Sequence, residues 1–174
     1  MSLHAHFTQF AAYNAWANRQ VYEAAARLSD EAYRRPVGAF FGSLHRTLNH
    51  ILTADRIWMA RFVGAGPAPD RLDAEQAATL SQLTAERQVE DDRIRRYIAS
   101  LDDAALAGSI TYRPITLPEP VTQPLSGGLA HFFNHQTHHR GQCHMILTVL
   151  GQPSLALDLA WFQRTPEAQA AARP

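Results

Sequence analysis

Apolar side chains recur at alternating steps of three and four residues along four long stretches of the chain, which predicts four amphipathic helices. The stretches cover residues 3–28, Ser43 to about residue 63, about residues 73–101, and Ser126 to Leu150. Ser43 is a residue type that caps a helix N-terminus, and Gly151 followed by Pro153 ends the last stretch. We therefore expect an all-α protein built as a four-helix bundle.

The connection between the third and fourth helices differs in composition. Residues 108–128 hold four prolines, which excludes a helix, and two short β-branched runs within them predict an edge hairpin. The gap is long enough for a crossover connection. A short C-terminal helix is expected over residues 155–164. We predict a single domain over residues 1–165 and a loose tail over residues 166–174.

Polar residues interrupt the predicted inner face of the fourth helix. That face reads, at steps of three and four, Gly128, Phe132, His135, His139, Gln142, Ile146 and Val149. A polar side chain buried without a partner costs about 2–7 kcal/mol. The middle of this face therefore requires hydrogen-bond partners or a metal ion.

His135 and His139 stand one helical turn apart, so both imidazoles can reach one ion. A third ligand must come from another helix. His50 is the natural candidate, although it lies to one side of the second helix's apolar stripe, and periodicity does not eliminate His45. His131 and His138 flank the pair and His144 points away from it, which favours a polar or exposed role for these three.

The first two helices each carry a polar residue in an otherwise apolar stripe, Asn14 and Asp55. A buried carboxylate near imidazoles can fix a histidine tautomer, bind the metal itself, or act as an acid or base. Asp55 is the best candidate for such a catalytic role. It could equally be the structural partner of an arginine such as Arg140.

Charge and cysteine content narrow the classes of function. The formal net charge is zero, so no overall field attracts nucleic acid or an acidic membrane. The basic cluster at residues 93–97 follows acidic residues directly and reads as a solvated helix face. Cys143 is the single cysteine, which excludes an internal disulfide, and it lies off the predicted inner face. With no signal peptide or apolar span, we expect a cytoplasmic protein that binds neither membrane nor nucleic acid.

Four segments carry a family resemblance: "YNAWAN" (13–18), "SLHRTLNHILTADRIWMARF" (43–62), "ITYR" (110–113) and "FNHQTHHRGQ" (133–142). In order and spacing they resemble the DinB/YfiT-like family of proposed metalloenzymes, over about residues 7–162. The resemblance implies a bundle in up-down-down-up order with a three-histidine metal site. Its ligands match His50, His135 and His139, which favours His50 over His45. It also implies a homodimer. Separately, apolar residues such as Trp161 and Phe162 could lie in a dimer interface.

Three imidazoles leave one position open on a tetrahedral ion, which is the layout of a catalytic zinc site. We expect one divalent ion, zinc or nickel. Related branches of the fold resemble thiol S-transferases that use low-molecular-weight thiols such as bacillithiol, mycothiol or glutathione. The preferred hypothesis is therefore a metal-dependent transferase that joins a small thiol to an electrophile.

Two alternatives remain at this point, a hydrolase that uses metal-bound hydroxide and a non-enzymatic metal-binding stress protein. The sequence contains no HExxH motif, so a zincin-type glutamate base is excluded. For Tyr112 and Arg113, in the proline-rich connection, loop packing is favoured over a place at the mouth of a pocket.

Overall fold

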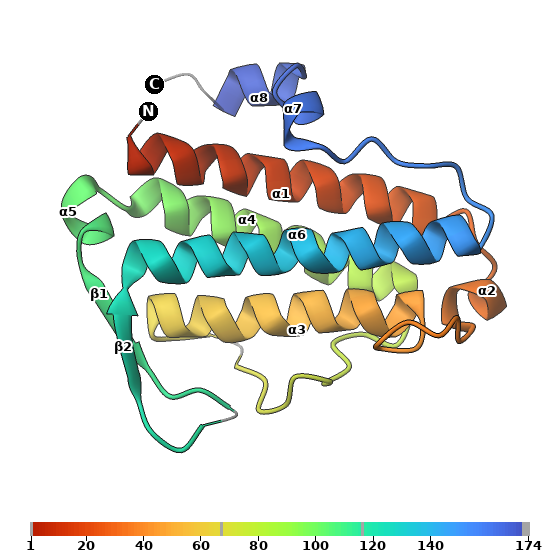
Figure 1. Ribbon diagram of the computed structural model, residues 1–174, viewed down its shortest axis with the longest axis horizontal. Coiled ribbons are helices and arrows are strands. Elements are labelled where there is room, and N and C mark those ends of the chain that lie inside the picture. Colours follow the sequence, from red (N-terminus) through yellow and green to blue (C-terminus); the bar gives the residue numbers. More distant parts are fainter. Residues whose placement is uncertain (1, 67, 116, 172–174) are drawn as a thin grey trace.

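Four long helices lie side by side in the computed structural model, which describes residues 2–66, 68–115 and 117–171 (Figure 1). They are α1 (Leu3–Ala25), α3 (Leu44–Val63), α4 (Leu80–Ser100) and α6 (Leu125–Val149). Helices α1 and α6 run in one direction, and α3 and α4 run in the other. Both α1 and α3 pack against α4 and α6. The predicted all-α, up-down-down-up four-helix bundle is confirmed.

The segment 64–79 makes the long crossover, because it returns along the bundle from the end of α3 to the start of α4 (Figure 1). The sequence pattern placed the start of the third long helix at about residue 73, which is wrong by seven residues. Thr79 caps α4 and forms a reciprocal capping box with Gln82. A short helix, α2 (Asp30–Arg34), precedes α3 and was not predicted.

The proline-rich connection contains the expected hairpin. Helix α5 (Asp103–Leu106) leads into strand β1 (Ser109–Tyr112), which pairs antiparallel with β2 (Val121–Pro124). Ser109 lies opposite Pro124, and Tyr112 lies opposite Val121. Both strands contact α6, and β1 also contacts α3, so the hairpin covers one end of the groove between these helices.

The C-terminal segment is more ordered than predicted. Helix α7 (Leu159–Phe162) is shorter than the expected helix over 155–164. Residues 166–171 form helix α8 (Pro166–Ala171) instead of a loose tail, and the Glu167 carboxylate lies 2.9 Å from the Arg19 guanidinium of α1. Residues 172–174 of the predicted tail lie outside the described residues.

Trp161 and Phe162, the two aromatic residues expected at a dimer interface, differ in burial. Phe162 is fully buried and packs against Tyr13 and Trp16, so it is not free for another chain. Trp161 is 54% exposed. The dimer itself stays a prediction.

Within the described residues, the core consists of three apolar clusters, one of them between α1 and the C-terminal helices, and a polar layer separates the other two. One cluster lies where α1 ends and α3 begins, and includes Val21, Leu48 and Leu147. The other lies at the opposite end and includes Phe7, Met59 and Phe132. The layer between them contains buried polar residues from all four long helices: Asn14, Asn18, Asp55, Arg87, Asp91, Gln136 and Arg140.

The inner face of α6 is rotated by about one residue from the predicted one. Gln136 and Arg140 are buried in the polar layer, whereas His135 is partly buried and Val149 is exposed. At about 100° per residue, this shift moves the histidines from the bundle axis to the edge where α6 meets α3. Among the helices of the described residues, none is long and apolar enough to cross a membrane.

Candidate metal centre

Three histidines from two helices come together at the edge between α3 and α6. His50 lies on α3, and His135 and His139 lie one turn apart on α6. One ring nitrogen of each lies within 4.8 Å of one ring nitrogen of the other two. The ring centroids of His50 are 5.4 Å from His135 and 4.6 Å from His139. The three residues expected as ligands therefore form one cluster.

Hydrogen bonds fix the orientation of two of the three rings. The Nδ1–H of His50 donates to the Leu72 carbonyl oxygen at 2.8 Å. The Nδ1–H of His139 donates to Oε1 of Gln142, also at 2.8 Å. Each bond leaves Nε2 unprotonated, as a metal ligand must be. Gln142 in turn donates from Nε2 to the Nε2 of His138 at 3.3 Å, which sets the direction of its amide.

Burial keeps these imidazoles neutral. Loss of solvent contact lowers the pKa of His135 to about 3, helped by repulsion from the neighbouring imidazoles. Burial lowers the pKa of His139 to about 4 and also lowers the pKa of His50. The ring of Phe41 stacks on His50 with a centroid distance of 4.0 Å and so shields that ring from water. At neutral pH no proton competes for the nitrogen lone pairs.

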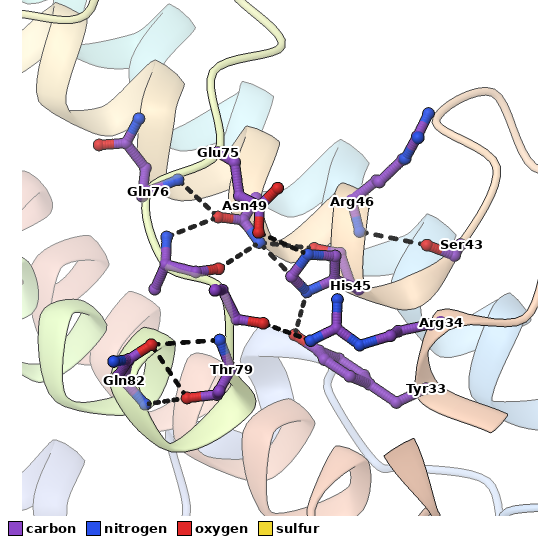
Figure 2. Close-up of polar contacts among 12 residues, drawn as sticks. Tyr33, Arg34, Ser43, His45, Arg46, Asn49, Glu75, Gln76, Thr79 and Gln82 are labelled. Carbon is purple, nitrogen blue, oxygen red and sulfur yellow. Dashed lines mark hydrogen bonds and ion pairs between the residues drawn. The ribbon is translucent and has the colours of Figure 1, made fainter. Parts of the chain in front are cut away.

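The crossover segment is held against α3 by side chains that surround His50 in sequence. Asn49 accepts hydrogen bonds from the backbone N–H groups of Gln76 and Ala77, at 2.7 and 3.1 Å (Figure 2). Thr53 donates to the Ala74 carbonyl oxygen at 2.7 Å. These contacts fix the segment that carries Leu72 and explain why α4 begins late.

His45, the alternative third ligand, belongs to this anchoring region and not to the cluster. It lies in hydrogen-bond range of the Tyr33 hydroxyl and the Glu75 carboxylate, both at 3.3 Å (Figure 2). Its polar atoms are therefore used in packing, and the choice of His50 over His45 agrees with the geometry.

Asp55 lies in the polar layer, where its carboxylate pairs with the guanidinium of Arg87. Burial raises its pKa to about 6, although Arg87 and the neighbouring Gln136 act in the opposite direction. The partner is thus Arg87 of α4 and not Arg140, which bonds to Asn14 and Asn18. This placement supports the structural role, and a role as acid or base stays a prediction.

The remaining residues singled out in the sequence lie around the cluster. His131 has its ring centroid 6.0 Å from that of His135 and 4.9 Å from that of Trp58. His138 is exposed, and His144 bonds to Ser154 and the backbone of Leu155. Cys143 is buried in an apolar cluster, away from the group of possible ligands.

A cleft of about 350 Å³ opens beside the histidines, between α3, α6 and the hairpin. Its lining includes His131 and His135 of α6 and Tyr112 of β1. Tyr112 thus lies in a pocket, against the favoured expectation of loop packing. Arg113 donates to the Pro118 carbonyl oxygen at 2.8 Å, which is the loop packing that was expected for it.

Two supporting groups were missed by sequence reasoning. Leu72 acts through its backbone carbonyl, which every residue type possesses, so its side chain gives no signal. Phe41 lies in a segment read only as a helix break. Gln142 was recognised as polar but not as the partner of His139, although a spacing of three residues places both on one side of a helix.

The residues fit a divalent ion. Ligand nitrogens in a tetrahedral zinc site lie roughly 3.4 Å apart, given Zn–N bonds of about 2.0–2.1 Å. A set of nitrogens within 4.8 Å reaches this arrangement after small side-chain movements. Three neutral imidazoles, two of them oriented through Nδ1, match the donor set of zinc, nickel, copper and iron sites.

Fold and cluster together define a class: an all-α bundle with a three-histidine group suited to a metal ion. The sequence profile of the DinB family matches residues 1–170, and the chain belongs to this family. Protein DinB of Bacillus subtilis (strain 168) is similar, with 28% identity over 153 residues that cover 84% of this chain and 87% of that protein.

Proposed function

We propose that this protein binds one divalent metal ion, zinc or nickel, through His50, His135 and His139, and uses it to transfer a low-molecular-weight thiol to an electrophile. The observation that carries the proposal is the cluster of three neutral imidazoles. Three such ligands would leave the fourth position of a tetrahedral ion open. When bound, such an ion lowers the pKa of a thiol or water at its remaining position and so supplies a nucleophile near neutral pH.

The protein's own residues hold the reactants in place. Leu72 and Gln142 orient two ligand imidazoles, and Phe41 shields the cluster from solvent on one side. The cleft next to His135 has a mostly apolar lining that can hold the carbon skeleton of an electrophile. During transfer, the thiol loses its proton to solvent, its sulfur forms a C–S bond, and the leaving group departs with the electron pair of its former bond.

The first test is metal content, measured by mass spectrometry on untagged protein. We expect near-stoichiometric metal in the wild type and its loss in His50→Ala, His135→Ala and His139→Ala. His144→Ala is the matched control, because His144 lies on the same helix but outside the cluster, bonded to Ser154 and the backbone of Leu155. Metal retained in His50→Ala would contradict the proposed ligand set.

The second test separates the transferase from the hydrolase. Metal-loaded protein is given a panel of thiols and electrophiles, and both thiol consumption and products are measured. A thioether product that requires the thiol supports the transferase. Product formed equally without thiol would show hydrolysis, and metal binding with no reaction across the panel would favour a non-enzymatic metal-binding protein.

A further inference from the structure

The cleft beside His135 contains one arginine among walls that are otherwise apolar or aromatic, apart from the two histidines. Arg61 lies on α3, near the end of the helix farther from His50. The lining also includes Ala54, Ile57, Trp58, Leu72, Tyr112, Pro114, Ile115, Leu117, Val121, His131 and His135. None of these residues is acidic, so the lining that the structure describes offers the guanidinium no counter-ion.

Two aromatic rings hold the guanidinium of Arg61 in place. Its Cζ atom lies 4.6 Å from the ring centroid of Trp58 and 4.5 Å from that of Tyr112. Contacts with ring faces stabilise the cation and restrict its movement, but they leave the N–H groups at its edge without acceptors. The ring centroids of Trp58 and Tyr112 are 5.1 Å apart. Helix α3 and strand β1 therefore each supply one of the two rings that contact Arg61.

Arg56, the other partly buried arginine of α3, differs from Arg61 because its guanidinium has partners. Arg56 pairs with Glu86 and also bonds to Gln76 at 2.7 Å. Within the described part of the chain, Arg61 has neither an ion pair nor a hydrogen bond of its side chain, although it is partly buried. A partly desolvated guanidinium with free N–H groups binds carboxylates well, because its fork matches both carboxylate oxygens.

We propose that Arg61 binds a carboxylate group of the substrate, so that the cleft selects acidic over neutral molecules. This inference rests on the proposed function for its assignment of the cleft to the substrate. The carboxylate can belong to the thiol or to the electrophile. Arg61 is a specificity residue in this scheme and does not act on the bond that breaks.

The geometry also limits the size of the ligand. Residues 50 and 61 are separated by about 16 Å along α3 at a rise of 1.5 Å per residue. Side chains of a helix lean towards its N-terminus, so the Arg61 side chain shortens this span from its side. The carboxylate must therefore be separated from the metal-binding atom by a chain of several bonds, which excludes molecules as short as mercaptoacetate.

The test uses cobalt-loaded protein and paired probes that differ in one group, 6-mercaptohexanoate and 6-mercaptohexanol. Binding is followed through the sulfur-to-cobalt absorption band. We expect the wild type to bind the acid at least about 10-fold more tightly than the alcohol, the lower end of the range for a hydrogen bond to a charged group. In Arg61→Met, which keeps most of the apolar stem, we expect this preference to fall below about two-fold.

Two control variants make the result specific. Arg96→Met removes an exposed arginine of α4 outside the cleft and should keep the full preference for the acid. Arg61→Lys keeps the charge but lacks the planar fork of the guanidinium, so it should retain part of the preference for the acid. Cobalt stoichiometry and the circular dichroism spectrum verify that each variant is folded. An equal affinity of folded wild type for acid and alcohol would overturn the inference for a carboxylate on the thiol and leave the proposed function intact.

A second readout does not depend on the metal or on a thiol. Octanoate is titrated into metal-free protein while the indole N–H resonance of Trp58 is followed by NMR, assigned with Trp58→Phe. We expect a shift in the wild type that is absent in Arg61→Met, and no response to octanol. This result in a protein that never binds thiols would support the carboxylate site while refuting the proposed transferase.

The same probes locate the carboxylate on one reactant. A preference for 6-mercaptohexanoate that depends on Arg61 places it on the thiol. If octanoate instead binds together with 2-mercaptoethanol, again in a manner that requires Arg61, the carboxylate belongs to the electrophile. An absence of both effects in folded, cobalt-loaded protein would refute a carboxylate role for Arg61.

Discussion

At the scale of single residues, the candidate site depends on histidines that are neutral before any metal arrives. Their pKa values are low because burial disfavours the imidazolium form and because neighbouring imidazoles repel its charge, His139 and His50 at His135 and His50 at His139. Carbonyl oxygens from Leu72 and Gln142 then select the tautomer of two rings. An imidazole prepared in this way binds a metal without first losing a proton.

This has a consequence for the metal-free protein. In the unfolded chain a histidine has a pKa of about 6.5, whereas in the folded chain the pKa of His135 is about 3. Between these values the unfolded state binds a proton that the folded state does not, so stability falls as the pH is lowered through 6.5 towards 3. We expect urea unfolding in chelator to show less loss of stability between pH 7 and 5 in His135→Asn than in the wild type. The difference is at most one proton, about 1.4 kcal/mol per pH unit.

The control is His138→Asn, which removes an exposed histidine of the same helix. It should change the pH dependence less than His135→Asn does, because His138 contributes least of the neighbouring imidazoles to the lowered pKa values of His135 and His139. The raised pKa of Asp55 acts in the opposite direction over part of this range, but it is present in all three proteins and cancels in the comparison. An unaltered pH dependence in His135→Asn would contradict the buried, neutral state of this ring.

The histidine pair of α6 could be singled out in the sequence by its spacing, and the family resemblance added His50, but the location of the cluster in the bundle could not be predicted. Spacing by threes and fours placed His135 and His139 on the bundle axis, whereas Gln136 and Arg140 occupy that position. A rotation of one residue moves the histidines to the edge between two helices. The same shift explains why periodicity placed His50 to one side of the apolar stripe of α3: all three candidate ligands lie on that side.

At the scale of elements, the crossover segment 64–79 links the architecture of the bundle to the chemistry of the site. Asn49 and Thr53 hold it on α3, on either side of His50, and Leu72 then supplies the acceptor for His50. Sequence pattern predicted helix from about residue 73, because the local composition permits one. The side chain of Asn49 prevents it by taking two backbone N–H groups that a helix would have used elsewhere.

We therefore expect Asn49→Ala to affect both stability and metal binding. The substitution leaves two backbone N–H groups without their acceptor, which costs about 1–3 kcal/mol of unfolding free energy for each group that stays buried. Because Leu72 lies on the released segment, metal affinity should fall as well, by about 10-fold or more. Urea unfolding and competition with a chelator measure the two effects.

Thr79→Ala is the matched control for this variant. It removes the cap of α4, which costs about 1 kcal/mol, but leaves the contacts next to His50 in place. Metal affinity should then stay within about two-fold of the wild type. A loss of metal affinity equal to that of Asn49→Ala would show that general loosening of the segment, and not Asn49, controls His50.

At the scale of the whole molecule, a layer of charged and amide side chains joins the four long helices. Asp91 accepts from Asn14 and Asn18 of α1, at 3.1 and 3.0 Å, and pairs with Arg87. Arg87 also pairs with Asp55 of α3. The two buried carboxylates and two buried guanidinium groups balance in charge, and each group needs its partners because water is excluded.

Removal of one charged member of this layer should lower the free energy of unfolding more than removal of an oppositely charged pair. Arg87→Leu leaves Asp55 and Asp91 without their cation, and we expect a loss of about 3–5 kcal/mol in unfolding free energy. Addition of Asp55→Leu should restore part of this loss, since one uncompensated carboxylate disappears. Arg95→Leu removes an exposed arginine that pairs with Asp92 and should cost less than about 1 kcal/mol. A similarly small cost for Arg87→Leu would refute the structural role of the layer.

Most of the fold followed from the sequence because amphipathic periodicity is a local signal, and the four long helices carry it clearly. The helix α8 did not follow, because its order depends on contacts with α1 such as the pair of Arg19 and Glu167. The polar layer was visible only as isolated irregularities, Asn14 and Asp55. The arginine with which Asn14 or Asp55 interacts depends on the order and rotation of the helices, and no local sequence pattern contains that information.

The position of α6 in the chain has a consequence for when the site can form. Two of the three histidines lie on the last long helix, which packs between α1 and α3. Chains emerge from the ribosome with the N-terminus first, so His50 is synthesised well before its two partners. The cluster cannot assemble until α6 has been made and has packed against α1 and α3. A metal ion can therefore bind the complete cluster only after the last long helix has been synthesised and has packed into the bundle.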